Sequence, residues 1–392
     1  MKTQGINRNR QKENNIRQII RLLYRTESCS RVSIANSMNL TQAAITKLVN
    51  PLIERGLVEE VQQINTASGR KPVQLKLAAD RFSIISARIN RDYVSAALND
   101  LCGAQQCCET LQTNPHSSPE DAFASFVSIV GHMIAKAKSK VLGIGIAVPG
   151  PFNMYSNTVT LMSGFSGWNR IDIKGRLEKE FGLPVFLEQD ANCGAMAELW
   201  CGNRNCENFV YVTADRGVGS GIVIDGQIYR GDVGYAGEFG HMSIRFDGPV
   251  CECGNHGCLE MYCSTNALEK RYCDKTGSRL SSSRIFELVR EGDSAAKEVY
   301  AETINYLSFG CASLINILNP EAVIFADKIT EGGDFFLSEV RSSLKRFLMP
   351  ELSGKIRVDI SRFEIDPTMI GAGVLVLDRM LEEGPEVLTS AR

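Results

Sequence analysis

Apolar residues near the N-terminus recur with the period of an amphipathic helix. The spacing i, i+3, i+4 and i+7 places them in one stripe along a helix face. The residues of this stripe are Ile16, Ile19, Ile20 and Leu23. A second, shorter helix is predicted from Ser30 to about Asn39, with Val32, Ala35 and Met38 facing inward.

A third helix is predicted after Thr41, whose side-chain oxygen can accept a hydrogen bond from a first-turn amide. Leu40 and Ile45 flank this cap with the spacing of a hydrophobic staple. Pro51 is expected to kink the helix, and Gly56 ends it. The opposite face carries small or polar side chains that can reach base edges and phosphates in a major groove. These residues are Gln42, Ala43, Thr46, Lys47 and Asn50.

Two short segments of alternating polarity follow the third helix, at 58–64 and 73–77. They predict a hairpin whose tip carries Arg70 and Lys71, which can touch phosphate or enter a minor groove. Three helices followed by such a hairpin predict a winged helix-turn-helix domain over residues 1–80. A module that docks onto another protein is the alternative interpretation.

Charge is unevenly distributed along the chain. Residues 1–80 hold 13 Lys+Arg and 6 Asp+Glu, a balance of +7, whereas the formal net charge of the 392 residues is -2. The remaining 312 residues therefore carry -9. A basic head on an acidic body favours a polyanionic partner for the head, and together with the polar helix face it favours DNA. A merely solvated basic surface is compatible with the same balance.

Beyond residue 81 the pattern changes to hairpins followed by helical sequence. The segments Phe82–Ile89 and 94–99 form one such unit, and 209–213 with 221–225 form another. This repetition predicts two related α/β lobes. The 13 cysteines, an odd number, do not resemble a disulfide framework and indicate a reducing, cytoplasmic setting. The sequence shows no signal peptide and no apolar run long enough to cross a bilayer, so no membrane insertion is expected.

A cluster of thiols is the most specific chemical feature of the chain. Cys251, Cys253 and Cys258 fall within eight residues, and His241 precedes them. Three thiolates and one imidazole are a typical tetrahedral ligand set for Zn²⁺. His256, inside the same loop, is the rival fourth ligand. Packing of reduced cysteines as small hydrophobic side chains is the alternative, but the polar composition of this loop argues against it.

The stretch G-E-F-G-H followed by C-x-C-G-x-x-G-C-x-E, over residues 237–260, resembles the signature of the ROK family (repressors, open reading frames, kinases). The head, at S-R-V-S-I-A and T-x-x-x-I-T-K-L-V, resembles the N-terminal domain of the NagC/Mlc-type repressors within that family. The resemblance implies a duplicated ribonuclease-H-like body, the fold of the actin and sugar-kinase superfamily. It implies a first lobe at 81–187 closed by a C-terminal helix at 368–392, and a second lobe at 188–367.

The resemblance also implies a ligand site. The zinc ligands would be His241, Cys251, Cys253 and Cys258, and the sugar-contacting residues would be Gln189, Asp190, Glu238, His241 and Glu260. The family's kinases use the acid at the position of Asp190 as the general base. The residue before it is usually Asn in the family, and Gln189 replaces it here.

Three stretches that hold ATP in the family's kinases are altered in this sequence. The first reads Arg88-Ile89-Asn90-Arg91-Asp92 where the family has D-x-G-G-T. The second places Asp215 in a glycine-rich turn, and the third reads Ala326-Asp327-Lys328 where Gly-Gly is expected. Acids and lost glycines oppose the close approach of phosphate to the backbone. We therefore expect no kinase activity and no catalytic residues.

These observations predict a sugar-responsive DNA-binding regulator, of the repressor type, that controls genes of carbohydrate uptake or catabolism. The expected partners are double-stranded operator DNA, a sugar or sugar-phosphate effector and a second copy of the chain, as a homodimer or homotetramer. An ATP-dependent sugar kinase is one alternative. A repressor that is titrated by a transport protein, without a small-molecule inducer, is the other.

Overall fold

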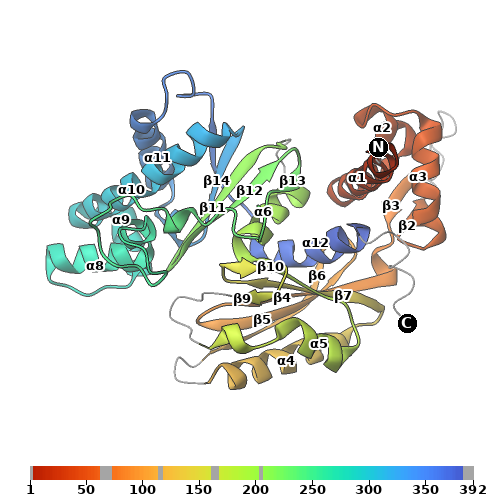
Figure 1. The fold of residues 1–392 in the computed structure, drawn as a ribbon, viewed down its shortest axis with the longest axis horizontal. Coiled ribbons are helices and arrows are strands. Elements are labelled where there is room, and N and C mark those ends of the chain that lie inside the picture. The colour runs from red at the N-terminus through yellow and green to blue at the C-terminus, as the bar shows by residue number, and fades with distance from the viewer. Residues whose placement is uncertain (1–2, 62–72, 114–117, 160–166, 203–205, 383–392) are drawn as a thin grey trace.

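The computed structural model describes residues 3–61, 73–113, 118–159, 167–202 and 206–382. Figure 1 shows an N-terminal unit beside a larger body of two lobes. The elements of the N-terminal unit are helices α1 (Thr3–Thr26), α2 (Arg31–Ser37) and α3 (Gln42–Glu54) and strands β1 (Cys29–Ser30), β2 (Val58–Val61) and β3 (Gln74–Leu77). The strands form one antiparallel sheet in the order β1-β3-β2.

The sequence predicts the helices of this unit well. The apolar stripe of α1 is buried throughout. Thr41 caps α3 as predicted, since its side chain accepts a hydrogen bond from the amide of Ala44 at 3.2 Å. The inward face predicted for α2 is wrong in part: Val32 is 42% exposed, and Ile34 is buried with Ala35 instead. Ile34 and Ala35 lie on the face of α2 that packs on the core, and the helical period places Val32 outside that face.

The third helix runs through Pro51 to Glu54, with Leu52 fully buried behind the proline. The packing of this last turn outweighs the hydrogen bond that a proline cannot make. The predicted hairpin tip, with Arg70 and Lys71, lies outside the described residues.

The body contains two five-stranded sheets with the same topology. The first is built from β4 (Phe82–Ile89), β5 (Tyr93–Asp100), β6 (Gln105–Gln112), β7 (Lys140–Val148) and β10 (Val185–Gln189), in the order β10-β7-β4-β5-β6. The second is built from β11 (Phe209–Ala214), β12 (Val218–Ile224), β13 (Gln227–Ile228), β14 (Ala322–Ala326) and β15 (Arg357–Ile360), in the order β13-β12-β11-β14-β15. In each sheet the first three strands pair antiparallel and the last two pair parallel. The repeated unit seen in the sequence is therefore a duplicated lobe.

Helices cover these sheets as two layers. In Figure 1, α4 and α5 lie on one face of the first sheet, and α12 lies on the other, beside α6. The helices of the body are α4 (Pro119–Lys136), α5 (Ile173–Phe181), α6 (Asp190–Cys201), α7 (Glu260–Cys263), α8 (Thr265–Thr276), α9 (Ser282–Glu291), α10 (Ser294–Leu318), α11 (Asp334–Phe347) and α12 (Pro367–Glu382). A short pair of strands, β8 (Phe152–Asn153) and β9 (Thr158–Val159), follows β7.

Helix α12 packs tightly because small residues line its contact. A Cβ on Gly145 of β7 would lie 1.8 Å from the carbonyl oxygen of Ala372, and one on Gly371 would lie 1.8 Å from that of Cys193 in α6. Backbones at this distance leave no room for a side chain. The close fit joins α12 to both lobes.

All 13 cysteines are free thiols, as the sequence predicts. None of the helices in the described part of the chain has both the length and the apolar character that a bilayer-crossing segment needs.

Candidate functional site

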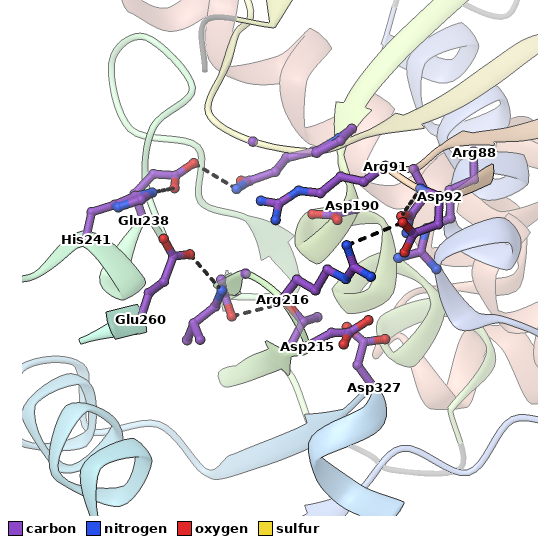
Figure 2. Close-up of a pocket in the computed structure, with 18 residues that line it drawn as sticks. Arg88, Arg91, Asp92, Asp190, Asp215, Arg216, Glu238, His241, Glu260 and Asp327 are labelled. Atoms are coloured by element: carbon purple, nitrogen blue, oxygen red, sulfur yellow. Dashed lines mark hydrogen bonds and ion pairs between the residues drawn. The ribbon is translucent and has the colours of Figure 1, made fainter. Parts of the chain in front are cut away.

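Five strands of the two lobes end at one pocket (Figure 2). The strands are β4, β7 and β10 of the first sheet and β11 and β14 of the second, which run parallel within each sheet. The carboxyl ends of parallel strands lie at the same edge of their sheet. The residues at or just after these strand ends are Arg88, Asn90, Arg91 and Asp92 of β4 and its turn, Pro149 and Gly150 after β7, Gln189 and Asp190 at the end of β10, Thr213, Asp215, Arg216 and Gly217 of β11 and its turn, and Asp327 after β14. Glu238, His241 and Glu260 close the opposite wall.

The structure brings all five predicted sugar-contacting residues to this pocket. Gln189 donates a hydrogen bond through Nε2 to Oε1 of Glu238 at 2.8 Å. The other oxygen of Glu238 lies 3.9 Å from Nε2 of His241. Glu260 accepts a hydrogen bond from the amide of Val218 at 3.3 Å. The five side chains therefore form one polar wall, although they are up to 71 residues apart in sequence (Gln189 to Glu260).

Gly150 gives this wall its close packing. A Cβ at that position would lie 2.3 Å from Nε2 of Gln189 and 2.7 Å from Oε1 of Glu238. Any side chain there would separate the hydrogen-bonded pair. The glycine after β7 is thus required by the site and not only by its turn.

The carboxylates of the wall crowd one another. Burial, with the negative charges of Asp190 and Glu260 nearby, raises the pKa of Glu238 to about 7. Burial also raises the pKa of Asp190, although the positive charge of Arg88 opposes it. Groups with such raised pKa values gain most from a ligand that donates hydrogen bonds to them.

The three altered phosphate stretches face the other side of the pocket, where ion pairs join them. Arg88 binds Asp366 at 2.6 Å, and burial, which alone would lower the pKa of Arg88, is overcome by that carboxylate. Arg216 lies 3.5 Å from Asp92. Lys328 lies 3.8 Å from Asp215. Figure 2 shows Arg91 and Arg216 reaching into the pocket from the two opposite turns.

Asp327 has a backbone conformation that glycine adopts easily and other residues rarely do. Its φ is 66° and its ψ is -171°. Burial, together with the nearby acids Asp190, Asp366 and Asp215, raises the pKa of Asp327 to about 7, against the opposing charge of Arg88. The chain therefore keeps a glycine-type turn after β14 while placing an acid in it.

The predicted metal ligands form one cluster. The donor atoms of His241, Cys251, Cys253 and Cys258 all lie within 4.8 Å of one another. The Cys251 Sγ to His241 Nδ1 distance is 3.7 Å, and the two sulfurs of Cys253 and Cys258 are 3.6 Å apart. Zn–S bonds of about 2.3 Å and Zn–N bonds of about 2.0 Å in a tetrahedron separate ligand atoms by roughly 3.5–3.8 Å. The residues present therefore fit a zinc ion.

The rival ligand His256 lies outside this cluster. It is exposed, and its Nδ1 lies 3.4 Å from the carbonyl oxygen of Gly248. Gly257 allows the loop to turn beside it: its φ is 64°, and a Cβ there would lie 1.7 Å from the carbonyl oxygen of Arg245. His241 is thus the histidine that the fold brings to the thiols.

The residues predicted to contact DNA lie on α3. Gln42, Ala43 and Lys47 are exposed, and Thr46 is half-buried, with its hydroxyl donating to the carbonyl oxygen of Gln42 at 2.9 Å. The structure therefore leaves most of this helix face open. Arg70 and Lys71 cannot be placed, because they lie outside the described residues.

Sequence reasoning missed a group of charges behind the pocket. Glu188 precedes Gln189 on β10 and binds Arg230 at 2.6 Å on the side away from the pocket wall. Arg379 of α12 lies 3.7 Å from the same carboxylate. A charged residue in an otherwise apolar strand was the available signal, because such a residue is almost never buried without a partner.

Known proteins resemble this chain over most of its length. A model of the ROK family matches residues 84–379. The xylose repressor of Bacillus spizizenii is 30% identical over 380 residues, which cover 95% of this chain and 97% of that protein. A solved structure described as a ROK family transcriptional regulator, homologous to the Escherichia coli MLC protein, has a TM-score of 0.80 and 26% identity, covering 96% of this chain and 98% of its own.

An enzyme with a similar fold matches less of the chain. The ROK family glucokinase of Streptomyces griseus, solved with glucose and AMPPNP, has a TM-score of 0.66 and 27% identity. It covers 75% of this chain and 98% of its own. The regulators therefore match nearly the whole chain, including most of the N-terminal unit, whereas the kinase matches three quarters of it. This difference agrees with the prediction that the protein is a regulator and not an enzyme.

Proposed function

Because the chain belongs to the ROK family, we propose that it is a sugar-responsive regulator of transcription, of the repressor type, that binds operator DNA through its N-terminal unit. The genes it controls would serve carbohydrate uptake or catabolism, as the name of the xylose repressor suggests for that relative. The observation that carries the proposal is the convergence of Asp190, Glu238 and Glu260 on one pocket whose phosphate side is filled by ion pairs.

The N-terminal unit would act as a winged helix-turn-helix over residues 1–80. Three helices and an antiparallel sheet support this assignment, since α3 follows α2 directly and presents Gln42, Ala43 and Lys47 to solvent. In such a unit the second helix of the motif lies in the major groove. The wing residues Arg70 and Lys71 would contact the DNA backbone. A homodimer, or a homotetramer of two dimers, would read paired half-sites.

The effector would bind with its hydroxyls donating to the carboxylates of Asp190, Glu238 and Glu260. Gln189 and His241 would complete the contacts, since they already hold Glu238 between them. A site built from buried hydrogen-bonding groups rejects analogues that leave those groups unpaired. The pocket is thus suited to a polyol ring.

The charges of the pocket favour an uncharged sugar over a phosphorylated one. In the described part of the chain, Arg88, Arg216 and Lys328 each have a carboxylate partner within 4 Å. Among the described residues, Asp190, Glu238, Glu260 and Asp327 have no such Lys or Arg partner, which leaves four acids facing Arg91. A phosphate dianion in this field would be repelled, whereas hydroxyls would be accepted.

Zinc would brace the wall that carries two of the sugar contacts. His241 would bind it through Nδ1, which faces the thiols, and present Nε2 to the pocket and Glu238. A structural zinc supplies fixed geometry and folding free energy, and no chemistry. The metal would thereby set the tautomer of His241 and the direction in which its ring faces the effector.

A thermal-shift panel tests the effector assignment. Free D-xylose, D-glucose and N-acetyl-D-glucosamine, and the phosphates of the last two, are compared on the full-length protein. A rise in melting temperature with at least one free sugar, greater than with any phosphate, is the expected result. A shift with ATP and turnover of a sugar would favour the kinase alternative. No shift with any of these compounds would favour a regulator titrated by a transport protein.

A further inference from the structure

Glu188 and Gln189 are neighbours on β10 and face opposite sides of the sheet, because successive side chains of a strand alternate. Gln189 faces the pocket and binds Glu238. Glu188, only 3% exposed, faces α12 and binds Nε of Arg230 at 2.6 Å. One peptide bond therefore connects the wall of the effector pocket to a buried carboxylate behind it.

Glu188 is tied to several elements at once. Its Oε1 accepts hydrogen bonds from Nδ2 of Asn192 at 3.0 Å and from the amide of Gln189 at 3.1 Å. Burial alone would raise the pKa of Glu188, but the guanidinium groups of Arg230 and Arg379 hold it below its ordinary value. Arg230 begins the loop that leads to Glu238, so the same carboxylate steadies two segments of the pocket wall.

From Glu188 a chain of ion pairs runs to the N-terminal unit. The guanidinium group of Arg379 lies between two carboxylates. Its Nη2 is 3.7 Å from Oε2 of Glu188, and its Nη1 is 3.0 Å from Oε2 of Glu382. Glu382 in turn lies 3.0 Å from Arg17 of α1. Arg17 also binds Asp378 of α12 at 2.7 Å, in a pair whose side chains are each 12% exposed.

The same helix α1 is held to the body by further contacts of its arginines. Arg21 donates to the carbonyl oxygen of Gly226 at 3.0 Å, and burial lowers its pKa to about 10. Arg25 donates to the carbonyl oxygen of Trp200 at 3.2 Å, at the end of α6. The rings of Tyr24 and Trp200 meet edge to face with centroids 6.0 Å apart. Helix α1 therefore rests on α6, which begins at the pocket residue Asp190, and on α12, which packs against α6 and β10.

We propose that Glu188 is a positioning residue for the effector response, acting through Arg379 and Glu382 on Arg17 of the DNA-binding unit. The proposal rests on the proposed function, because it assumes an effector at Gln189 and a DNA-binding role for α1–α3. A ligand that moves the end of β10 changes the distance between Glu188 and Arg379. The charged groups of a partly buried ion pair have few other partners nearby, so they must move together or lose the pair. A change in the distance between Glu188 and Arg379 therefore changes which arrangement of α12 and α1 is favoured.

The variants Arg379→Met and Glu382→Gln test this route, because neither residue lines the effector pocket. DNA binding is measured by fluorescence anisotropy, with a duplex selected from a random library by the wild-type protein without sugar. D-xylose, D-glucose and N-acetyl-D-glucosamine are the sugars. Each variant is expected to keep the sugar-free duplex Kd and the sugar Kd within about threefold of wild type. The change in duplex Kd caused by sugar, about 5- to 150-fold for a typical allosteric protein, is expected to fall at least threefold.

Arg284→Met is the control, since Arg284 pairs with Glu287 at 2.7 Å and with Glu291 at 3.0 Å, all on α9 of the second lobe and away from this route. The control is expected to respond to sugar as wild type does. Arg379→Lys, which keeps the charge, is expected to retain most of the response, which a loss of packing alone would not restore. Responses of Arg379→Met and Glu382→Gln that equal those of wild type and control would overturn the proposal while leaving the proposed function intact. A wild-type protein that binds the duplex and ignores all three sugars would contradict the proposed function itself.

Discussion

Arg216, on the turn after β11, forms an ion pair with Asp92, on the turn after β4, with 3.5 Å between Nη1 and Oδ1. The two turns belong to different lobes, and the resemblance to the family's kinases implies that each would be a phosphate-holding turn there. Both side chains are about half exposed, so the pair adds little stability. Its consequence is steric and electrostatic, because it fills the space between the lobes where phosphates would bind.

The filled phosphate side predicts that the protein does not bind ATP. Titration of the full-length protein with AMPPNP and Mg²⁺ in a calorimeter is expected to give no saturable heat up to roughly 1 mM, which corresponds to a binding free energy weaker than about 4 kcal/mol. The Streptomyces griseus glucokinase, solved with this nucleotide, is the positive control. Saturable binding at lower concentration would show that the ion pairs yield to phosphate.

Asp327 predicts a pH-dependent stability. Its pKa of about 7 in the fold exceeds its ordinary value near 3.8, so the folded state holds this proton more tightly than the unfolded state. The stability that this proton provides is present at low pH and is lost as pH rises from about 4 to about 7. Asp327→Asn, which stays neutral, is therefore expected to gain melting temperature over wild type, and to gain more at pH 8 than at pH 5.

Asp327→Gly separates the backbone from the charge. Glycine adopts a φ of 66° with a ψ of -171° without strain. The same backbone conformation costs other residues about 1–3 kcal/mol. This variant is expected to melt at a higher temperature than Asp327→Asn at both pH values. An Asn variant whose advantage does not change with pH would show that Asp327 is ionised throughout this range in the fold.

The cluster of thiols predicts one zinc per chain. Metal analysis of the purified full-length protein is expected to give that ratio, and Cys253→Ser is expected to lose both zinc and thermal stability, because metal binding contributes to folding. Cys108→Ser, which removes an exposed thiol of β6, is the control. Loss of zinc from His256→Ala but not from His241→Ala would move the fourth ligand to the loop histidine.

The exposed face of α3 predicts that Lys47 neutralises a phosphate. Lys47→Ala is expected to weaken duplex binding across sequences, and to lower the slope of log Kd against log salt by about 1. Lys179→Ala, an exposed lysine of α5, is expected to change neither. An unchanged salt slope in Lys47→Ala would remove this residue from the interface.

The predictable parts of this protein are those with local signals. Thr41 caps its helix, and the stripe from Ile16 to Leu23 is buried, because both depend on neighbours within one or two turns. The motif with His241 and the three cysteines is equally local, since the fourth ligand precedes the first thiol by ten residues. The spacing alone could not choose between His241, which the family resemblance implied, and His256, because that choice depends on how the loop closes around Gly257.

The parts that escaped prediction depend on distant partners. Glu188 pairs with Arg230, which is 42 residues later in the sequence, and lies near Arg379, which is 191 residues later. No local pattern in the sequence predicts either contact. The sequence showed that Arg88 replaces an acid of the family's motif. It could not show the ion pair with Asp366, because that residue lies 278 residues away. The inward face predicted for α2 was wrong at Val32, because a helix of seven residues has too few turns for its apolar pattern to show which face packs on the core.

The most direct test of the account is duplex binding with and without free sugar, for wild type and Glu238→Gln. Glu238→Gln replaces one acceptor oxygen by an NH₂ donor, so a sugar hydroxyl that donates to that oxygen loses its acceptor, a loss of roughly 1–3 kcal/mol or about ten- to hundredfold in affinity. We expect both proteins to bind the duplex equally without sugar. At a sugar concentration near its Kd for wild type, sugar should change the duplex affinity of wild type and of Glu252→Gln, an exposed carboxylate of the zinc loop, and should change that of Glu238→Gln little. A Glu238→Gln protein that responds to the same sugar as strongly as wild type would contradict the account.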